Sequence, residues 1–345
     1  MKKTSLFLTA LLFIAASAMA QTTHTVCASG CDFTTIQAAI NAATAGDVIE
    51  VGAGTYNYIT EGSPAPAGLI KVTKGVTIKA ATGARPIIDG SNFDGIFKIH
   101  PSALLPGNTV KIEGFELTGN LLTGIAITMQ GCFDVTPAHV VINDNWFHGM
   151  LGGIHMWGAS SYLPSGWTSA VANVEITNNK FYNLVHNPSG TEQGFGLLLY
   201  GAANWATAGN DYAYKVENNE FSNIQSNNIN PGVGIAIDHM GETWQAANVY
   251  ISGNKFTTVP AGIIINDGDV TDTKIENNGF ISNSAYAVLV QNVENSPVNA
   301  TCNWWGTNDA DVIPTKIFGP VTWVPFWVSD EGPCLQKMFE LKIGN

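Results

Sequence analysis

The sequence has few positive charges, and this scarcity narrows its possible partners. Among 345 residues only 15 are Lys or Arg, against 27 Asp or Glu, and Arg85 is the single arginine. Nucleic-acid binding needs clustered cations on one face of a protein, so the composition argues against it. An enzyme that cleaves uronate polymers must neutralise a carboxylate with Arg, Lys or bound Ca²⁺, so the composition weighs against that activity too.

Beyond its first twenty residues the sequence lacks an apolar run long enough to span a bilayer. Residues 1–20 themselves are typical of a secretory signal peptide. Lys2 and Lys3 precede an apolar core from Leu6 to Ala16, and a small-residue cleavage site ends at Ala20. We therefore expect cleavage near Ala20 and a location that is secreted, periplasmic or at the cell surface.

Cysteine is scarce and odd in number. The five are Cys27, Cys31, Cys132, Cys302 and Cys334. At least one must stay unpaired. In an oxidising compartment Cys27 could pair with Cys31 and Cys302 with Cys334, but the sequence leaves both pairings open. We expect Cys132 to be a small apolar side chain, and no cysteine–histidine spacing suggests zinc.

What the sequence does contain is a repeated phrase. In each copy an apolar residue is followed three positions later by Asn, and two positions after that Asn comes a large aromatic residue. The copies run Ile142 to Phe147, Ile176 to Phe181, Val216 to Phe221, Ile251 to Phe256, Ile275 to Phe280 and, in altered form, Ala300 to Trp305. The asparagines are 34, 40, 35, 24 and 25 residues apart, which indicates a minimal repeat of about 24 residues with insertions in the longer copies.

Each repeat alternates as a strand does. Val174 and Ile176 point one way, and Glu175 and Thr177 point the other. A single repeat cannot bury its apolar row, but stacked repeats with parallel strands can. We expect each Asn to occupy the same corner with left-handed backbone, bonded to its copies, and each Phe to stack inside. A leucine-rich repeat is the alternative, but no helical period appears and Gly and Asn interrupt every repeat.

Three stretches carry a resemblance to a known family. They are Phe33 to Tyr56, the repeated asparagines, and Asn303 to Thr307 with Val321 to Trp327. With these the chain resembles the pectate-lyase-like (pectin lyase-like) proteins over roughly residues 27–330. The resemblance implies an all-β, single-stranded right-handed parallel β-helix. It implies little about activity, because this fold hosts lyases, hydrolases, esterases, epimerases and non-enzymes.

The two ends of such a coil must be covered. Thr34 to Ala43 is predicted to be an amphipathic helix, capped by Asp32 or Thr34, that closes the N-terminal end. Residues 306–345, with Trp323 to Trp327, are expected to cap the other end. No linker rich in Pro or Ser appears, so we predict one domain, residues 21–345.

One outward strand face can be assigned from the alternation. The predicted inward pairs are Phe97/Ile99, Ile125/Ile127, Ile154/Met156, Leu197/Leu199, Ile235/Ile237, Ile263/Ile265 and Val288/Val290. The outward column after each pair is predicted to be His100, Thr128, Trp157, Tyr200, Asp238, Asn266 and Gln291. The column between each pair is predicted to be Lys98, Ala126, His155, Leu198, Ala236, Ile264 and Leu289.

In enzymes of the family that this chain resembles, the corresponding face commonly carries the sugar groove. The resemblance makes Trp157, Tyr200, His239, Asn266 and Gln291 candidate substrate-binding residues. It makes His155, Tyr200, Asp238 and Lys98 candidate catalytic residues. Insertions from Tyr162 to Val171, Val185 to Gly194 and Ala202 to Tyr212 would wall the groove. The alternative is that outward residues of any solenoid are polar and that aromatic residues suit strands anyway.

The chemistry tests on this face are mostly negative. Glycoside hydrolysis needs two facing carboxylates, and Asp238 has only Asp267 nearby, predicted to lie past the strand. The Asp-His of Ile237 to Met240 matches the Asp-Pro-His motif of alginate epimerases only without its proline. A lyase could draw a base from Lys98, His155 or Tyr200, but it has no neutralising arginine there.

Calcium could supply the missing charge. The loop predicted from Asp267 through Asp269 to Asp272 is the most acidic of the chain, and it is a candidate Ca²⁺ site although it lacks EF-hand spacing. The sequence therefore predicts an exported carbohydrate-associated protein whose partner is a polysaccharide or cell-surface glycan, through binding or a structural role. The alternative is a polysaccharide lyase.

Overall fold

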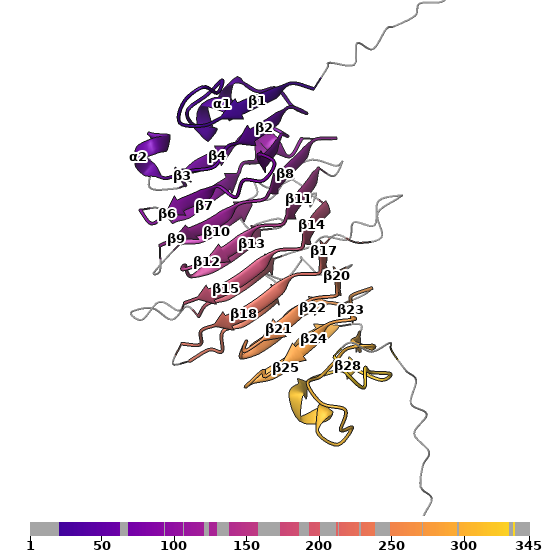
Figure 1. Ribbon diagram of the computed structural model, residues 1–345. Helices are drawn as coiled ribbons and strands as arrows, with labels where there is room; N and C mark the ends of the chain where they lie inside the picture. Colours follow the sequence, from indigo (N-terminus) through magenta and orange to yellow (C-terminus); the bar gives the residue numbers. More distant parts are fainter. Residues whose placement is uncertain are drawn as a thin grey trace, which may run out of the picture.

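The chain winds as a right-handed parallel β-helix, in which short strands stack around one long core (Figure 1). The computed structural model describes residues 21–62, 68–92, 94–105, 107–120, 124–129, 138–157, 173–185, 193–200, 212, 214–227, 229–238, 249–270, 272–294, 297–330 and 334. The predicted signal peptide, Cys132 and most of the three predicted insertions lie outside these residues, as do the side chains at 157, 200, 267–269 and 294. The predicted fold class is confirmed.

Within the described residues the strands form three all-parallel sheets of 11, 8 and 9 strands, called sheets A, B and C. Sheet A contains β1 (Thr23–Val26), β2 (Val48–Val51), β5 (Thr77–Ala80), β8 (Thr109–Glu113), β11 (His139–Asn143), β14 (Asn173–Thr177), β17 (Tyr214–Glu217), β20 (Val249–Ser252), β23 (Lys274–Glu276), β26 (Val298–Asn299) and β28 (Val321–Thr322). Sheet B contains β3 (Thr55–Tyr56), β6 (Ile87–Gly90), β9 (Glu116–Gly119), β12 (Trp146–His148), β15 (Lys180–Leu184), β18 (Glu220–Ile224), β21 (Lys255–Thr257) and β24 (Gly279–Ile281). Sheet C contains β4 (Ile70–Val72), β7 (Gly95–Ile99), β10 (Ile125–Met129), β13 (Gly152–Trp157), β16 (Phe195–Tyr200), β19 (Val233–Asp238), β22 (Ala261–Asp269), β25 (Tyr286–Glu294) and β27 (Ile317–Phe318).

From β2 to β25 each turn of the coil contributes one strand to each sheet in the order A, B, C. Successive turns pair in register, as Val140 with Val174 in sheet A and Phe147 with Phe181 in sheet B. Because side chains alternate along each strand, one apolar row per strand points inward and joins a single continuous core.

A buried column of asparagines fixes the corner between sheets A and B. Its members, here called the asparagine ladder, are Asn145, Asn179, Asn219, Asn254, Asn278 and Asn303, all 0–1% exposed. The side-chain oxygen of Asn219 accepts hydrogen bonds from the backbone N–H of Asn179 at 2.9 Å and from its side-chain amide at 3.0 Å. The amide of Asn179 also donates to the carbonyl of Ile142. The same backbone bond joins each neighbouring pair of the ladder, so buried backbone groups at the corner are satisfied.

The left-handed backbone at this corner lies one residue earlier than predicted. At this corner the residues that directly precede the ladder have φ between 52° and 67°: Asp144, Asn178, Asn218, Gly253, Asn277 and Cys302. The prediction that the ladder asparagines adopt this conformation is therefore wrong. The ladder side chain must point inward, so the preceding residue makes the sharp turn.

The aromatic rings after the corner stack inside the coil as predicted. Phe147, Phe181, Phe221, Phe256, Phe280 and Trp305 form this stack. Neighbouring ring centroids are 4.5 to 5.2 Å apart, close to the spacing between strands. The rings and the ladder thus share one period.

The predicted N-terminal helix is present, with a different cap. Helix α1 spans Ile36–Ala42, within the predicted range. Its N-cap is Thr35, whose hydroxyl accepts a backbone hydrogen bond at 3.1 Å, so the predicted caps Asp32 and Thr34 are wrong. Asp32 instead accepts hydrogen bonds from the backbone and hydroxyl of Thr25 in β1.

Helix α1 covers the first turns of the coil, at the indigo end of Figure 1. Ile36, Ala39 and Ile40 are buried in the continuous core. Glu61, in the short helix α2 (Tyr58–Glu61), accepts hydrogen bonds from the first two N–H groups of α1 and so completes its N-terminus.

The segment after the last full turn packs against the other end of the core. Ile313, in the 3₁₀-helix Ile313–Lys316, and Phe326 are buried there, and Trp323 packs beside them. Both cysteine pairings that the sequence left open are present, Cys27–Cys31 and Cys302–Cys334. The second ties the described end of the chain to the ladder corner. No helix in the described segments is long and apolar enough to cross a membrane.

The asparagine ladder predicts that replacing one of its asparagines with alanine lowers the stability of the protein strongly. Asn219→Ala would remove the acceptor of the Asn179 amide and the donors to Ile176 and Asn254. Each buried group left unpaired costs about 1–3 kcal/mol, so we expect roughly 3 kcal/mol or more of lost stability in urea unfolding. Asn41→Ala, on the exposed side of α1, is the control and is expected to change stability by less than about 0.5 kcal/mol. Equal unfolding midpoints for the two variants would contradict the structural role of the ladder.

Candidate functional site

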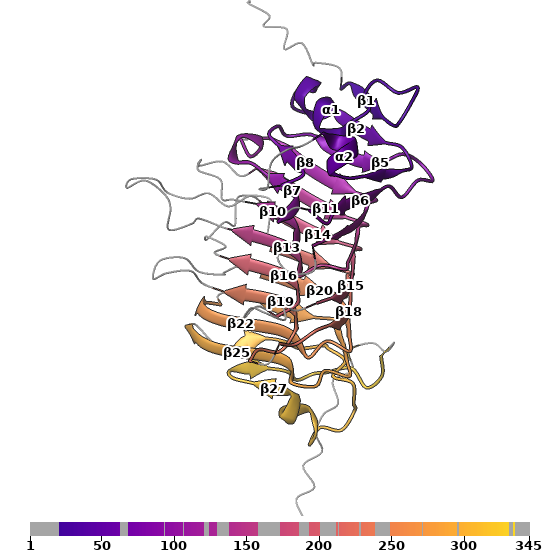
Figure 2. The same ribbon diagram turned by 90° about the vertical axis from the view of Figure 1, so that its left-hand side faces the viewer.

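The outer face of sheet C carries the column of residues that the sequence singled out. Figure 2 shows the strands of this sheet lying one above another along the coil. The strand register aligns Trp157 with Tyr200, Tyr200 with Asp238, Asp238 with Asn266, and Asn266 with Gln291. These five residues, here called the polar stripe, therefore occupy one column on adjacent strands.

The described part of the polar stripe is linked by hydrogen bonds. The amide of Asn266 donates to the Asp238 carboxylate at 3.3 Å. The Asn266 oxygen accepts from the amide of Gln291 at 3.0 Å and from that of Asn292 at 3.3 Å. These contacts hold the side chains in a row, while Gln291 and Asn292 remain exposed. The predicted contact residue His239 lies outside the described residues.

The predicted register of β10 is wrong. Ile127 aligns with the first inward residue of both neighbouring strands, so the inward pair is Ile127 and Met129, not Ile125 and Ile127. Thr128 therefore belongs to the column of Lys98 and His155 and not to the stripe. Ala126, predicted to point outward, is fully buried. His100 follows the end of β7, and its side chain caps the short 3₁₀-helix Pro101–Ala103.

A glycine column explains the shift. Ala126 lies in the row of Gly153, Gly196, Gly234 and Gly262. A Cβ at Gly196 would lie 2.5 Å from the Gly234 carbonyl oxygen and 2.6 Å from the ring of Phe221, so the stacked rings leave no room for a side chain. In β10 the residue at this position is Ala126 and not a glycine. Gly124 lies two residues earlier, so aligning the glycines predicts the strand two residues too early in the sequence.

In these strands of sheet C the glycine and the residue directly after it both point inward. The residue directly before the glycine therefore points outward. Leu151, Phe195, Val233 and Ala261 form a second buried apolar cluster, separate from the core. Leu198, Ala236 and Ile264, from the column between the inward pairs, pack against it. The face thus has an apolar band beside the polar stripe.

His155 lies at the edge of this apolar band. It is 9% exposed and meets the ring of Phe195 edge-on, with centroids 6.4 Å apart. Burial lowers the pKa of His155 to about 3. The imidazole is therefore neutral at physiological pH and takes up a proton poorly, which weakens it as a general base.

The four predicted catalytic residues do not form one cluster. Lys98 lies on β7 and Tyr200 on β16, and the intervening strands β10 and β13 separate them by three strand spacings, roughly 14 Å. Of the four, only Tyr200 and Asp238 are direct register partners on adjacent strands.

The acidic segment after the stripe differs from the predicted loop. The backbone of Asp267 to Asp269 continues strand β22, with Gly268 aligned with Val293 and Asp269 with Glu294. Asp267 therefore lies within the strand and not past it, because β22 and β25 stay paired beyond the stripe. Asp272 is a turn residue with φ 58°. The side chains of Asp267 and Asp269 lie outside the description, so the calcium site stays a prediction.

Arg85 is not near the polar stripe. It precedes β6 of sheet B, where its guanidinium makes two 2.9 Å bonds to the Asp144 carboxylate. The same guanidinium lies over the ring of Trp146, 4.4 Å from its centroid. The single arginine is thus engaged on a different face of the coil.

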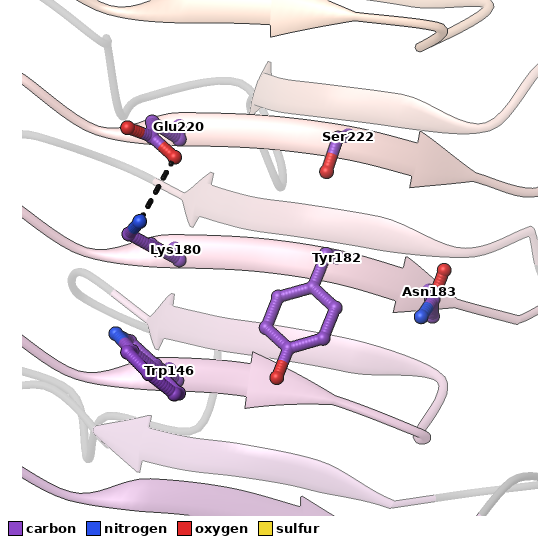
Figure 3. Close-up of a pocket in the computed structure, with 6 residues that line it drawn as sticks. All are labelled: Trp146, Lys180, Tyr182, Asn183, Glu220 and Ser222. Carbon is purple, nitrogen blue, oxygen red and sulfur yellow. Dashed lines mark ion pairs between the residues drawn. The ribbon is translucent and has the colours of Figure 1, made fainter.

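The outside of sheet B also holds a cavity that the sequence did not indicate. Its volume is about 330 Å³, and it is lined by Trp146, Lys180, Tyr182, Asn183, Glu220 and Ser222 (Figure 3). Trp146, Lys180 and Glu220 are the middle residues of the repeated Asn–x–ring phrase. Their position in the motif is the sequence signal for this site, because a residue between two inward-pointing residues of a strand must point outward.

Comparisons with known proteins show similarity of backbone course only. No protein-family model matches the chain, and no curated protein does. One similar solved structure is the A-module of a mannuronan C-5 epimerase from Azotobacter vinelandii, 16% identical over 79% of this chain and 74% of that chain, with a TM-score of 0.39. A rhamnogalacturonan lyase is 13% identical over 89% and 87%, with a TM-score of 0.33. An alginate lyase from Paenibacillus is 13% identical over 90% and 98%, with a TM-score of 0.30. Values this low give no evidence about the activity of this chain.

The buried His155 predicts a pH effect on stability. Its pKa is 6.5 when unfolded and about 3 when folded, so between these values the unfolded chain binds the extra proton. Its contribution to stability is therefore present above pH 6.5 and is lost as pH falls, by roughly 3 kcal/mol at pH 4.

His155→Gln, which does not titrate, is expected to flatten the pH dependence of the urea unfolding midpoint between pH 6.5 and pH 4. Asn41→Ala, which leaves every titratable group in place, is the control and should keep the slope of the unchanged protein. Parallel curves for all three proteins would show that His155 is not held neutral by burial.

Proposed function

We propose that the protein is an exported carbohydrate-binding β-helix protein that holds a polysaccharide or a cell-surface glycan along the polar stripe of sheet C. The observation that supports the proposal is the strand register, which aligns the backbones of Trp157, Tyr200, Asp238, Asn266 and Gln291 in one column on adjacent strands. A column of this kind runs parallel to the coil axis, so it suits an extended chain ligand.

The chemistry of the stripe fits sugar rings. A pyranose has an apolar face that packs on aromatic rings and a rim of hydroxyls that bond amides and carboxylates. Trp157 and Tyr200 supply the aromatic residues at one end of the stripe, and Asn266 and Gln291 supply amides at the other. The hydrogen bonds that link Asp238, Asn266 and Gln291 hold these groups in place before a ligand arrives, which lowers the entropy cost of binding.

Several observations favour binding over catalysis on this face. Among the described side chains of the stripe, Asp238 is the one carboxylate, whereas glycoside hydrolysis uses two. Arg85 is bound to Asp144 on sheet B and does not reach the stripe. Burial keeps the pKa of His155 far below neutrality. The adjacency of Tyr200 and Asp238 is the observation that keeps a polysaccharide lyase as the second candidate, with the Tyr200 phenol as the base.

Export to an oxidising compartment accords with the cysteine pairing. Cys27–Cys31 and Cys302–Cys334 are both disulfides, and stable disulfides are typical of secreted, periplasmic and surface proteins. The sequence pattern of residues 1–20 supports the same location.

A polysaccharide panel tests this function. The mature protein would be titrated with acidic and neutral polysaccharides, with and without Ca²⁺, while the ultraviolet absorbance of unsaturated products and the release of reducing ends are followed. We expect binding to at least one polymer without product. Unsaturated product would establish the lyase alternative, and a folded protein that binds no polymer would overturn the proposal.

Variants of the stripe locate the binding face. Trp157→Ala and Tyr200→Ala are each expected to weaken polymer binding by about tenfold, equivalent to about 1.4 kcal/mol, because each removes one stacking ring. Tyr250→Ala removes an outward ring from sheet A and is the matched control, expected to leave the affinity unchanged. If both stripe variants bind as tightly as the unchanged protein, the ligand does not lie on sheet C.

A further inference from the structure

The cavity on the outside of sheet B lies on a different face from the polar stripe. It spans β12, β15 and β18, and Figure 3 shows its six lining residues on these three neighbouring strands. The register aligns Trp146 with Lys180 and Lys180 with Glu220 in one outward column. A second column holds His148, Tyr182 and Ser222. The cavity therefore arises from two adjacent columns across three turns of the coil.

Tyr182 provides a flat surface in this cavity. Its ring stacks on the imidazole of His148, with centroids 4.9 Å apart and planes 20° apart. In Figure 3 the ring extends from β15 toward β12 with its broad face turned to the viewer. His148 is held in turn by Glu116, 2.9 Å from its Nε2. Burial, with the nearby Glu116 charge, raises the pKa of Tyr182, so the phenol keeps its proton at neutral pH.

Trp146 stands beside this surface. Arg85 covers its ring at 4.4 Å, and the two Arg85–Asp144 hydrogen bonds keep the guanidinium in that position. Lys180 lies 5.9 Å from the same ring centroid on the cavity side. The indole is half-buried and supported, so it meets a ligand without losing much rotamer freedom.

Polar groups line the rest of the cavity. Lys180 and Glu220 form an ion pair at 3.3 Å, drawn as a dashed line in Figure 3. Ser222 and Asn183 lie near the ring of Tyr182, and the Asn183 oxygen accepts a hydrogen bond from Asn223 at 2.6 Å. The cavity thus offers an aromatic ring on one side and hydrogen-bond donors and acceptors around it, which is the pattern that recognises a sugar.

Within the cavity lining the one cation pairs with the one carboxylate, whereas Lys255, the register partner of Glu220 on β21, lies outside the lining. Arg85 is paired with Asp144, and Lys180 is paired with Glu220. No cation of the lining is left over to neutralise a carboxylate or sulfate, and the chain as a whole carries a formal charge of −12. A polyanion would therefore be repelled at long range and would break an existing ion pair to bind. An uncharged ligand avoids both costs.

We propose that this cavity binds a pyranose unit of an uncharged glycan, with the sugar face on Tyr182 against Trp146 and its hydroxyls on Lys180, Glu220, Asn183 and Ser222. The site is separate from the polar stripe and does not depend on the function proposed for it. The protein then carries two glycan-binding faces, one on sheet C along the coil and one on sheet B for a single neutral ring.

The test uses neutral methyl glycosides as probes. The mature protein would be titrated by calorimetry or ligand-observed NMR with methyl glucoside, methyl galactoside and methyl mannoside, and with methyl galacturonate as the acidic counterpart. We expect saturable binding of at least one neutral glycoside, with a Kd on the order of 1 mM or below, and weaker binding of the galacturonate. Absence of saturable binding for all three neutral glycosides overturns the proposal, as does tighter binding of the galacturonate.

Three variants assign the binding to the cavity. Tyr182→Ala removes the stacking face and is expected to weaken binding at least tenfold, whereas Tyr182→Phe keeps the ring and should stay within about threefold. Ser222→Phe fills the cavity while every stacking contact is kept, so it should also abolish binding. If circular dichroism shows that Tyr182→Ala is unfolded, the Ser222→Phe variant decides whether the glycoside binds in the cavity. Unchanged affinity in Ser222→Phe or in a folded Tyr182→Ala overturns the assignment.

The stripe variants separate the two faces. The double variant Trp157→Ala with Tyr200→Ala removes any glycoside binding at the polar stripe and leaves the sheet B cavity intact, so saturable binding of the methyl glycoside is expected to remain in it. If the glycoside is lost in this double variant and kept in Tyr182→Ala, the sugar lies on sheet C and the sheet B site is wrong, while the function proposed for the stripe still holds.

Discussion

The buried asparagine ladder is the interaction on which the rest of the structure depends. At the corner between sheets A and B the backbone turns sharply and would leave buried N–H and C=O groups unpaired. Each ladder side chain satisfies such groups in the preceding turn, so it couples neighbouring turns through hydrogen bonds between uncharged groups. Because the ladder sets the corner, it also sets which residues after it point inward to the ring stack and which point outward.

That constraint explains why two faces with different chemistry exist on one coil. Outward positions that are not covered by an apolar cluster lie outside the core, so their residues can contact a ligand, and the fixed strand spacing arranges them in columns. On sheet C the column is extended and amide-rich beside an apolar band. On sheet B the ion pairs Arg85–Asp144 and Lys180–Glu220 surround two aromatic rings within a small cavity. The first arrangement suits a chain, and the second suits a single ring.

Two of the predictions from the sequence that are wrong concern the coil, and each has its own physical reason. The alternation of apolar residues identified the strands, but a glycine column forced by the ring stack makes two successive residues of sheet C point inward. In β10 Ala126 takes the place of the glycine and Gly124 lies two residues earlier, so the sequence pattern predicts β10 two residues out of register. The left-handed residue was likewise assigned to the ladder asparagine, because sequence shows that a corner exists and not which residue turns it.

The sequence by itself determined the class of fold, the ladder, the ring stack and the alignment of Trp157, Tyr200, Asp238, Asn266 and Gln291, because all of these follow from a phrase that repeats with local alternation. Only the tertiary structure decided which cysteines pair, where Arg85 lies, and that Trp146, Tyr182, Lys180 and Glu220 line one open cavity. Arg85 and Asp144 are 59 residues apart, and such contacts depend on the hydrogen-bond register between turns and on side-chain conformation, neither of which a single repeat encodes.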